Sequence, residues 1–174
     1  MSAATDALTD PERGFLGCLM QLPAAAARRL LAGMRADDMA GAVTAPVLRL
    51  AIELAAADTA PAPVALYAHA ITTGRAPGRQ RREWLSGWLI DTYRDAPPPA
   101  LADHLKTAVL EAAWRRALLA HTQRVQDAAE TADVDRLHEL ADDTDVVDEL
   151  WQRYHAARAG QVGTSLTARL GVAA

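Results

Sequence analysis

Residues 107–142 read "TAVLEAAWRRALLAHTQRVQDAAETADVDRLHELAD", and this stretch decides the fold. No glycine or proline interrupts residues 101–132, so we predict one long helix across that range. Asp133 is a typical N-cap residue, and the segment after it has apolar residues at helical spacing, namely Val134, Leu137 and Leu140. The stretch therefore predicts a helical hairpin, in which a shorter helix returns beside the long one.

The apolar positions of this hairpin and of the helix after it indicate an assembly surface. A helix of this length needs a partner for its apolar side, because isolated helices are only marginally stable in water. A final helix is expected over residues 146–154, with its apolar residues on one face. The candidate interface residues are Leu110, Trp114, Leu118, Val125, Leu137, Leu140, Val147, Leu150, Trp151 and Tyr154.

Upstream of the hairpin, the sequence predicts a compact unit of helices that begin near residues 10, 23, 44, 63 and 80. We expect Asp10 and Thr44 to be N-caps, because each precedes a proline that suits the first turn of a helix. Prolines disfavour helix before them, so the segments at residues 58–63 and 95–100 separate helices.

These patterns predict an all-α protein. It consists of a compact bundle of about five to six helices, followed by a long helical hairpin and a C-terminal linker-like helix. The expected boundaries are a flexible lead at 1–9, the globular helical unit at 10–98, the hairpin at 99–143, the linker-like helix at 144–159 and a flexible tail at 160–174.

The first helix, within "DPERGFLGCLMQLP" at residues 10–23, carries two glycines and the only cysteine of the chain. A glycine inside a helix costs about 1 kcal/mol relative to alanine, so Gly17 predicts a close approach by a neighbouring helix. We expect a leucine at this position to destabilise the fold by steric clash. Cys18 lies beside an apolar face, which favours a buried structural thiol over a reactive nucleophile.

The sequence contains no recognisable constellation for catalysis, cofactor binding or metal binding. A phosphate-binding loop needs glycines followed by a lysine, and the only lysine, Lys106, stands in "HLKTAV". "HELAD" at His138 lacks the second histidine of a zinc-hydrolase motif, and "DDTDVVDE" lacks the central glycine of a calcium loop. We expect no enzymatic activity and no cofactor; an enzyme with an unrecognised site is an alternative.

The charge distribution bears on nucleic-acid binding. The net charge of −4 disfavours general binding to phosphate backbones. The densest basic patch is "RAPGRQRRE" at residues 75–83, which is typical of a solvated loop and helix start. The alternative is that these arginines bind single-stranded nucleic acid together with tryptophans, of which the chain has Trp84, Trp88, Trp114 and Trp151.

A cytoplasmic location is expected from three absences. One cysteine cannot form an internal disulfide, the N-terminal sequence lacks the pattern of a signal peptide, and no apolar run approaches the ~20 residues of a membrane span. Met1 and the Gly/Ala-rich end are typical of a complete short gene product, with a truncated longer protein as the alternative.

Three segments resemble the N-terminal domain of DnaB-type bacterial replicative helicases. "ERGFLGCLMQLPAAAARRLLAGMRADDM" at 12–39 is similar to the start of that domain, with its acidic residue and leucine-glycine step. "VLRLAIELAAADTAPAPVALYAHAITTG" at 47–74 resembles the helix pair that follows. Residues 107–142 resemble the helical hairpin, including the "DVDRL" turn.

This resemblance implies a fold and a function. In the family, a six-helix globule and a hairpin pair with a second copy into a collar over the motor ring, and the collar binds primase and helps loading. The sequence has none of the ATP-binding motifs of the motor. The resemblance thus implies a non-catalytic replication module that self-associates through its hairpin and binds a helicase, primase or loader.

Overall fold

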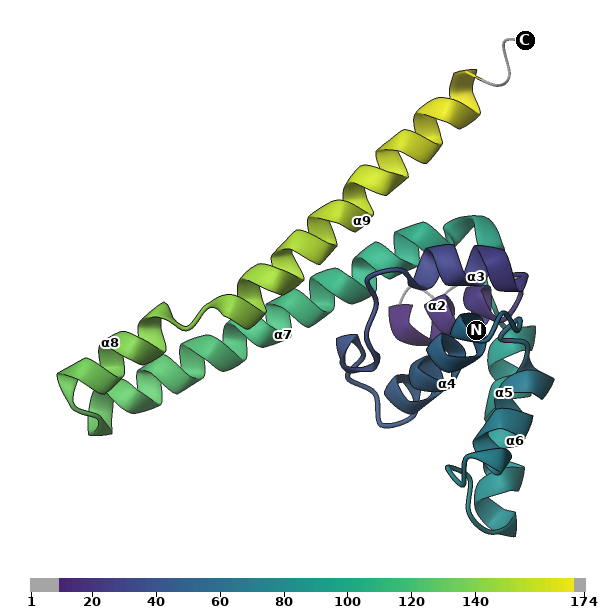
Figure 1. The fold of residues 1–174 in the computed structure, drawn as a ribbon, viewed down its shortest axis with the longest axis horizontal. Coiled ribbons are helices and arrows are strands. Elements are labelled where there is room, and N and C mark those ends of the chain that lie inside the picture. The colour runs from purple at the N-terminus through teal and green to yellow at the C-terminus, as the bar shows by residue number, and fades with distance from the viewer. Residues whose placement is uncertain (1–9, 171–174) are drawn as a thin grey trace. The chain divides into compact units, whose positions relative to one another are not determined.

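The computed structural model describes residues 10–170 and the side chains of residues 10–161. The expected flexible lead at 1–9 and the last part of the expected tail, 171–174, lie outside the described residues. Within the described range every regular element is a helix, which confirms the all-α prediction (Figure 1). The chain divides into two units, a globular unit that ends at Val109 and a hairpin unit that begins at Leu110.

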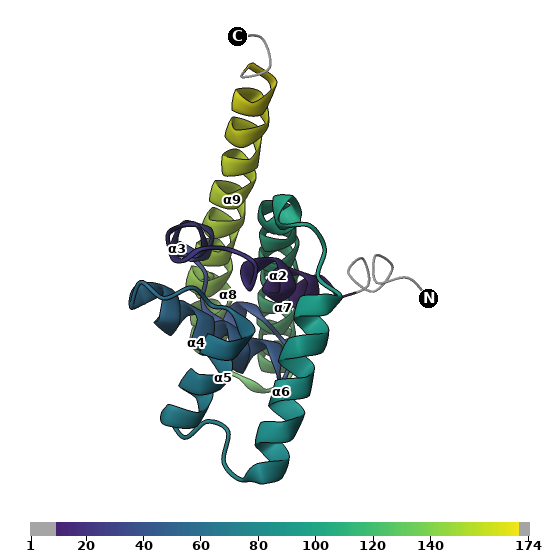
Figure 2. The same ribbon diagram turned by 90° about the vertical axis from the view of Figure 1, so that its right-hand side faces the viewer.

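The globular unit is built from short helices around one apolar core. α3 and α5 both pack on α4, α2 packs on α4 and on α6, and α5 and α6 form an antiparallel pair (Figure 2). Fully buried apolar side chains of the core include Phe15, Leu16, Leu19, Leu48, Leu66 and Leu89. The elements are α2 (Pro11–Leu19), α3 (Ala24–Leu31), η1 (Ala36–Asp38), α4 (Thr44–Ala56), α5 (Pro63–Thr72), α6 (Arg79–Arg94), η2 (Pro99–Leu101) and the first turns of α7 (Ala102–Thr131).

Helix α2 approaches the end of α6 closely at Gly17. Asp10 is its N-cap, as predicted, and accepts a hydrogen bond from the backbone N–H of Arg13 at 3.0 Å. A Cβ atom added at Gly17 would lie 2.7 Å from the Cβ of Ala96 and 2.9 Å from the carbonyl oxygen of Thr92. Both distances are shorter than van der Waals contact, so only glycine fits here without movement of the backbone.

Polar side chains of α2 and of the turn after it hold the same contact on either side of Gly17. The Arg13 guanidinium donates to the Thr92 hydroxyl at 3.2 Å and to the Asp95 carboxylate at 3.3 Å. The Gln21 amide donates to the carbonyl oxygens of Gly17 and Pro97, both at 3.2 Å. These bonds join α2 and the turn after it to the end of α6 and to the segment that follows α6.

A carboxylate from α2 organises the loop before α4. Glu12 accepts hydrogen bonds from the backbone N–H groups of Ala40 at 2.7 Å and Gly41 at 3.1 Å, and from the Thr44 hydroxyl at 2.5 Å. The prediction that Thr44 is an N-cap is wrong, because its hydroxyl bonds to Glu12 and to the Gly41 carbonyl. Val43 takes the N-cap position, without a side-chain hydrogen bond to the helix.

Lys106 joins the start of α7 to the end of α3. Its ammonium group donates to the carbonyl oxygens of Leu30 at 2.8 Å and Ala32 at 2.7 Å. The last carbonyls of a helix lack partners within it, so a cation there satisfies them and complements the helix dipole. This contact places the first turns of α7 in the globular unit, which therefore extends to Val109 and not to the expected residue 98.

The hairpin unit consists of the remainder of α7, α8 (Val134–Asp142) and α9 (Asp145–Leu170). Asp133 caps α8, as predicted, by accepting a hydrogen bond from the backbone N–H of Arg136 at 2.8 Å. Residues 160–170, expected to belong to a flexible tail, continue α9 instead. Glycine weakens a helix without ending it, and no proline follows Asp145 in the sequence.

We predict that Gly17→Ala lowers the midpoint of thermal unfolding, although alanine is the better helix former. The added methyl group must push Ala96 away, and overpacking of this kind costs about 1–3 kcal/mol. Gly17→Leu should lower the midpoint further. Circular dichroism at increasing temperature measures both effects.

Gly87→Ala is the matched control for this prediction. Gly87 also lies inside a helix, α6, but nothing lies within 4 Å of an added Cβ. Gly87→Ala should therefore raise stability by up to about 1 kcal/mol. A Gly17→Ala protein that melts no earlier than the unmodified chain would disprove the packing explanation.

Candidate protein-interaction surface

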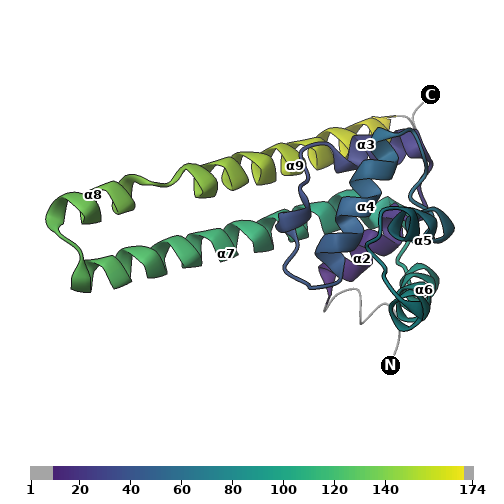
Figure 3. The same ribbon diagram turned by 60° about the horizontal axis from the view of Figure 1, so that its bottom comes forward.

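The hairpin is held by a seam of apolar positions on α7 and on the returning helices. Along α7, buried and half-buried positions recur every three or four residues from Leu110 to Ala128, a spacing typical of a helix that packs along a partner. Figures 1 and 3 show α8 beside the C-terminal turns of α7.

The predicted interface residues divide by exposure. Leu110, Val147 and Leu150 are buried. Only two have exposed side chains: Leu118, at 38 %, and Trp151, at 41 %. The half-buried members are Trp114, Val125, Leu137, Leu140 and Tyr154. Three of the ten are therefore covered in this structure and seven keep some exposed surface, and their role in an interface stays a prediction.

An aromatic cluster joins α7 to α9. The ring centroids of Trp114 and Trp151 are 4.9 Å apart, and those of Trp151 and His155 are 4.1 Å apart. Tyr154 lies 5.8 Å from Trp151, and the Arg158 guanidinium lies 5.5 Å from the Tyr154 ring centroid. Contacts of this kind add about 0.5–1.5 kcal/mol each beyond the burial of area.

Sequence reasoning named Trp114 and Trp151 but missed His155 and Arg158. The sequence does contain a signal for these two residues. His155 follows Trp151 by four positions and Arg158 follows Tyr154 by four, so each pair lies on the same face of a helix. The pairing of the two tryptophans also has a sequence signal. Trp114 lies 17 positions before Thr131, and Trp151 lies 18 positions after Asp133, so both are similarly distant from the turn of the hairpin.

Several large apolar side chains of the hairpin unit point into solvent, and we call them the outer apolar residues. Val134 is 81 % exposed, Leu119 is 70 % exposed and Val146 is 61 % exposed. None of these three was named as a candidate interface residue. The set comprises Leu118, Leu119, Val134, Val146 and Trp151. These residues come from α7, α8 and α9. Where such side chains form one contiguous patch, the patch is typical of a surface that meets another protein.

The charged groups of the hairpin pair mainly with neighbours on their own helix. Arg115 contacts Glu111 at 2.7 Å, and Arg136 contacts Glu139 at 3.0 Å. Exposed pairs at these spacings contribute about 0.3–0.5 kcal/mol each.

The described residues were compared with the requirements of a metal site and of a membrane span. No group of three or more histidine, cysteine, aspartate or glutamate side chains could hold a metal ion among the described residues. The His138 imidazole has one acidic neighbour, Asp142, at 3.7 Å. No helix in the described range is long and apolar enough to cross a membrane.

Cys18 has the properties of a structural thiol. Its side chain is fully buried, and its Sγ atom donates to the carbonyl oxygens of Pro97 and Pro98, both at 3.4 Å. Burial raises the pKa of the Cys18 thiol to about 11. The thiolate, which is the nucleophilic form, is therefore scarce near neutral pH.

No protein-family model matches the chain, and no curated protein is similar to it. The resemblance to the helicase N-terminal domain therefore rests on the three sequence segments quoted above and stays a prediction.

We predict that Cys18 resists labelling by DTNB in the folded protein near neutral pH. Labelling should be at least ~100-fold slower than in the guanidinium-unfolded chain, because the thiol must be exposed before it can react. Absorbance of the released thionitrobenzoate measures the rate, with Cys18→Ala as the background control. Labelling of the native protein at the unfolded rate would contradict the assignment.

Proposed function

We propose that this chain is a non-catalytic protein-interaction module of DNA replication, similar to the collar domain of replicative helicases and acting in the cytoplasm. The hairpin associates with a second copy of the chain. The module binds primase, replicative helicase or its loader, and it uses no cofactor.

The observation that best supports this proposal is the exposure of the outer apolar residues. The helices of the hairpin already pack on one another through other residues, so these side chains are left uncovered. The aromatic cluster at Trp114 and Trp151 gives the hairpin its internal cohesion. More than half of the surface of Val134, Leu119 and Val146 is exposed, so most of it remains outside that seam. A second protein that covers them removes apolar surface from water. This burial is favourable by about 25 cal/mol for each Å².

The order of the elements supports the same proposal. Within the described residues a compact helical unit comes first, then α7 and α8 with the predicted hairpin turn between them, and α9 comes last. This is the order that the resemblance implies for the globule and the hairpin, and α9 includes the predicted linker-like helix at 144–159. The resemblance supplies the replication context, while the outer apolar residues supply the reason to expect association.

We predict that Val134→Asp reduces self-association of the chain. Val134 is the first residue of α8, where an acidic side chain suits the helix dipole, so the substitution should leave the fold intact. Multi-angle light scattering after size exclusion should show a multimer for the unmodified chain. For the variant it should show a mass shifted towards the monomer.

Val64→Asp is the matched control. Val64 is 80 % exposed, lies in the first turn of α5 and belongs to the globular unit, so it should leave the mass unchanged. A pull-down with purified primase and with replicative helicase tests the replication context. A strict monomer that captures neither protein would refute the proposal.

A further inference from the structure

A hollow on the globular unit has an apolar floor and a charged, aromatic rim. Its lining comes from the loop before α4 and from α4, α5 and α6, with Val43, Val47, Leu50 and Leu85 among its apolar residues. Arg75, Arg81 and Trp84 complete the lining. All of these residues lie within the globular unit.

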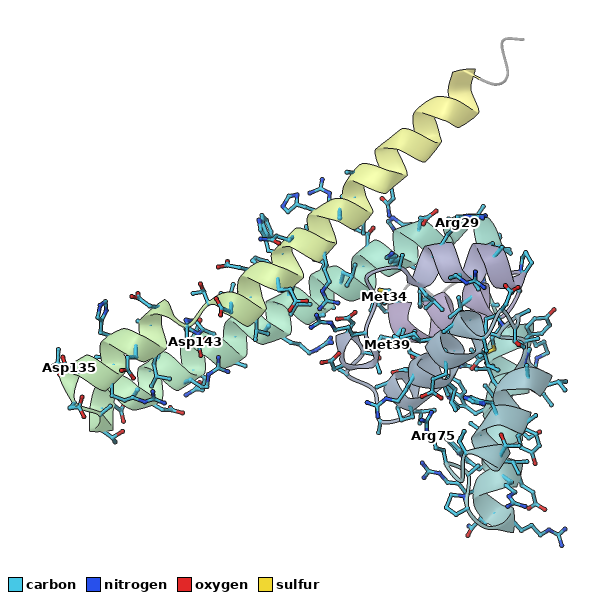
Figure 4. The ribbon with its side chains drawn as sticks, viewed as in Figure 1. Arg29, Met34, Met39, Arg75, Asp135 and Asp143 are labelled. Carbon is cyan, nitrogen blue, oxygen red and sulfur yellow. The ribbon has the colours of Figure 1, made fainter. Side chains whose placement is uncertain are left out.

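Arg75 is a fixed part of the rim. Both of its terminal nitrogens donate to the Glu53 carboxylate at 2.7 Å, and the His69 Nε2 lies 2.7 Å from the same carboxylate. The Arg75 bond holds the pKa of Glu53 below its usual range. The loop that carries Arg75 joins α5 to α6 (Figure 4), so the pair with Glu53 fixes that loop on α4.

Arg81 and Trp84 form the adaptable part of the rim. The Arg81 guanidinium lies 5.8 Å from the Trp84 ring centroid, and no carboxylate pairs with it in the described part of the chain. Trp84 is 46 % exposed. Tryptophan and arginine are each enriched at the centres of protein interfaces.

The charge around the hollow is opposite in sign to that of the chain. Arg75, Arg79, Arg81 and Arg82 occur within eight positions, whereas the whole chain has a net charge of −4. Glu53 neutralises Arg75, and Glu83 contacts Arg79 at 2.6 Å. The nearby arginines therefore outnumber the glutamates that pair with them, and this excess positive charge lies beside the apolar floor.

We propose that this hollow binds a peptide segment of another protein in which bulky apolar residues are flanked by acidic residues. The apolar side chain enters the floor between Val43, Val47 and Leu85, and its ring or chain packs against Trp84. A neighbouring carboxylate pairs with Arg81. This inference stands independently of the proposed association through the hairpin, because its residues belong to the other unit.

The hollow suits a peptide better than it suits single-stranded nucleic acid. A nucleic-acid site needs a track of free cations spaced along the phosphates, together with exposed rings for base stacking. Two of the four arginines here already pair with glutamates. The apolar floor offers no hydrogen bonds to a base, whereas it can cover an aliphatic or phenyl side chain.

Fluorescence anisotropy of a short fluorescein-labelled peptide tests the proposal on the full chain. The probe carries leucine and phenylalanine between aspartates, and a second probe replaces both apolar residues with glycine. We expect Arg81→Glu and Trp84→Ala each to weaken binding of the first probe by about tenfold or more. The glycine probe should bind the unmodified chain at least about tenfold more weakly.

Two matched variants serve as controls. Arg79→Glu makes the same charge change on α6, at a side chain that is 92 % exposed and outside the hollow. Tyr93→Ala removes an aromatic side chain with the same exposure as Trp84, 46 %, from a position on α6 outside the hollow. Both should leave the affinity for the peptide within about twofold of the unmodified chain.

Three results would overturn the proposal: no binding of the first probe, equal binding of the glycine probe, or equal loss in Arg79→Glu and Arg81→Glu. Tighter binding of oligothymidylate that depends on Arg81 and Trp84 would assign the hollow to nucleic acid and overturn it as well. The glycine probe needs no variant, so the test holds even where a substitution fails to fold. Val134→Asp should leave peptide binding unchanged, which separates this proposal from hairpin association.

Discussion

The close contact between α2 and the end of α6 is the constraint on which the globular unit depends. At Gly17 the two elements are so close that the glycine hydrogen fits against Ala96, whereas a side-chain carbon would not. The short distance allows side chains next to Gly17 to form hydrogen bonds across the contact. Arg13 donates to Thr92 and Asp95. Cys18 donates to the carbonyl oxygens of Pro97 and Pro98, and Gln21 donates to that of Pro97. Because the paired residues are 76 to 82 positions apart, this one contact closes most of the globular unit into a single core.

Two further sets of hydrogen bonds position the elements next to this contact. Glu12, on the same helix, fixes the backbone at Ala40 and Gly41 and so sets the start of α4. That start provides part of the lining of the hollow, since Val43 and Val47 belong to it. Lys106 fixes the end of α3 from α7, and burial lowers the pKa of its ammonium group. The apolar core supplies the driving force, while these bonds set the geometry.

The two units present different kinds of surface. The hairpin is stabilised internally by its seam and its aromatic cluster. It exposes aliphatic residues, of which Val134 and Val146 lie within the acidic stretch at residues 133–149. The globular unit exposes a hollow in which arginine and tryptophan adjoin an apolar floor. A surface that is mainly aliphatic favours association with another apolar surface, whereas the arginine and tryptophan favour an acidic partner. The two proposals therefore concern different partners and can fail separately.

The sequence by itself determined what depends on neighbours along the chain. It predicted the helical class, the caps at Asp10 and Asp133, and the turn of the hairpin, because capping and helical periodicity act over a few residues. It also singled out Gly17, since a glycine inside a helix indicates crowding. It could not name Ala96 as the neighbour, or foresee that Glu12 would take the Thr44 hydroxyl. Only the tertiary structure decided that Val134 and Leu119 are exposed while Val147 and Leu150 are buried. It alone also brought Arg75, Arg81 and Trp84 together around one hollow. The physical reason is that burial and side-chain pairing depend on which distant segments pack together, and each helix has several apolar faces that could be covered.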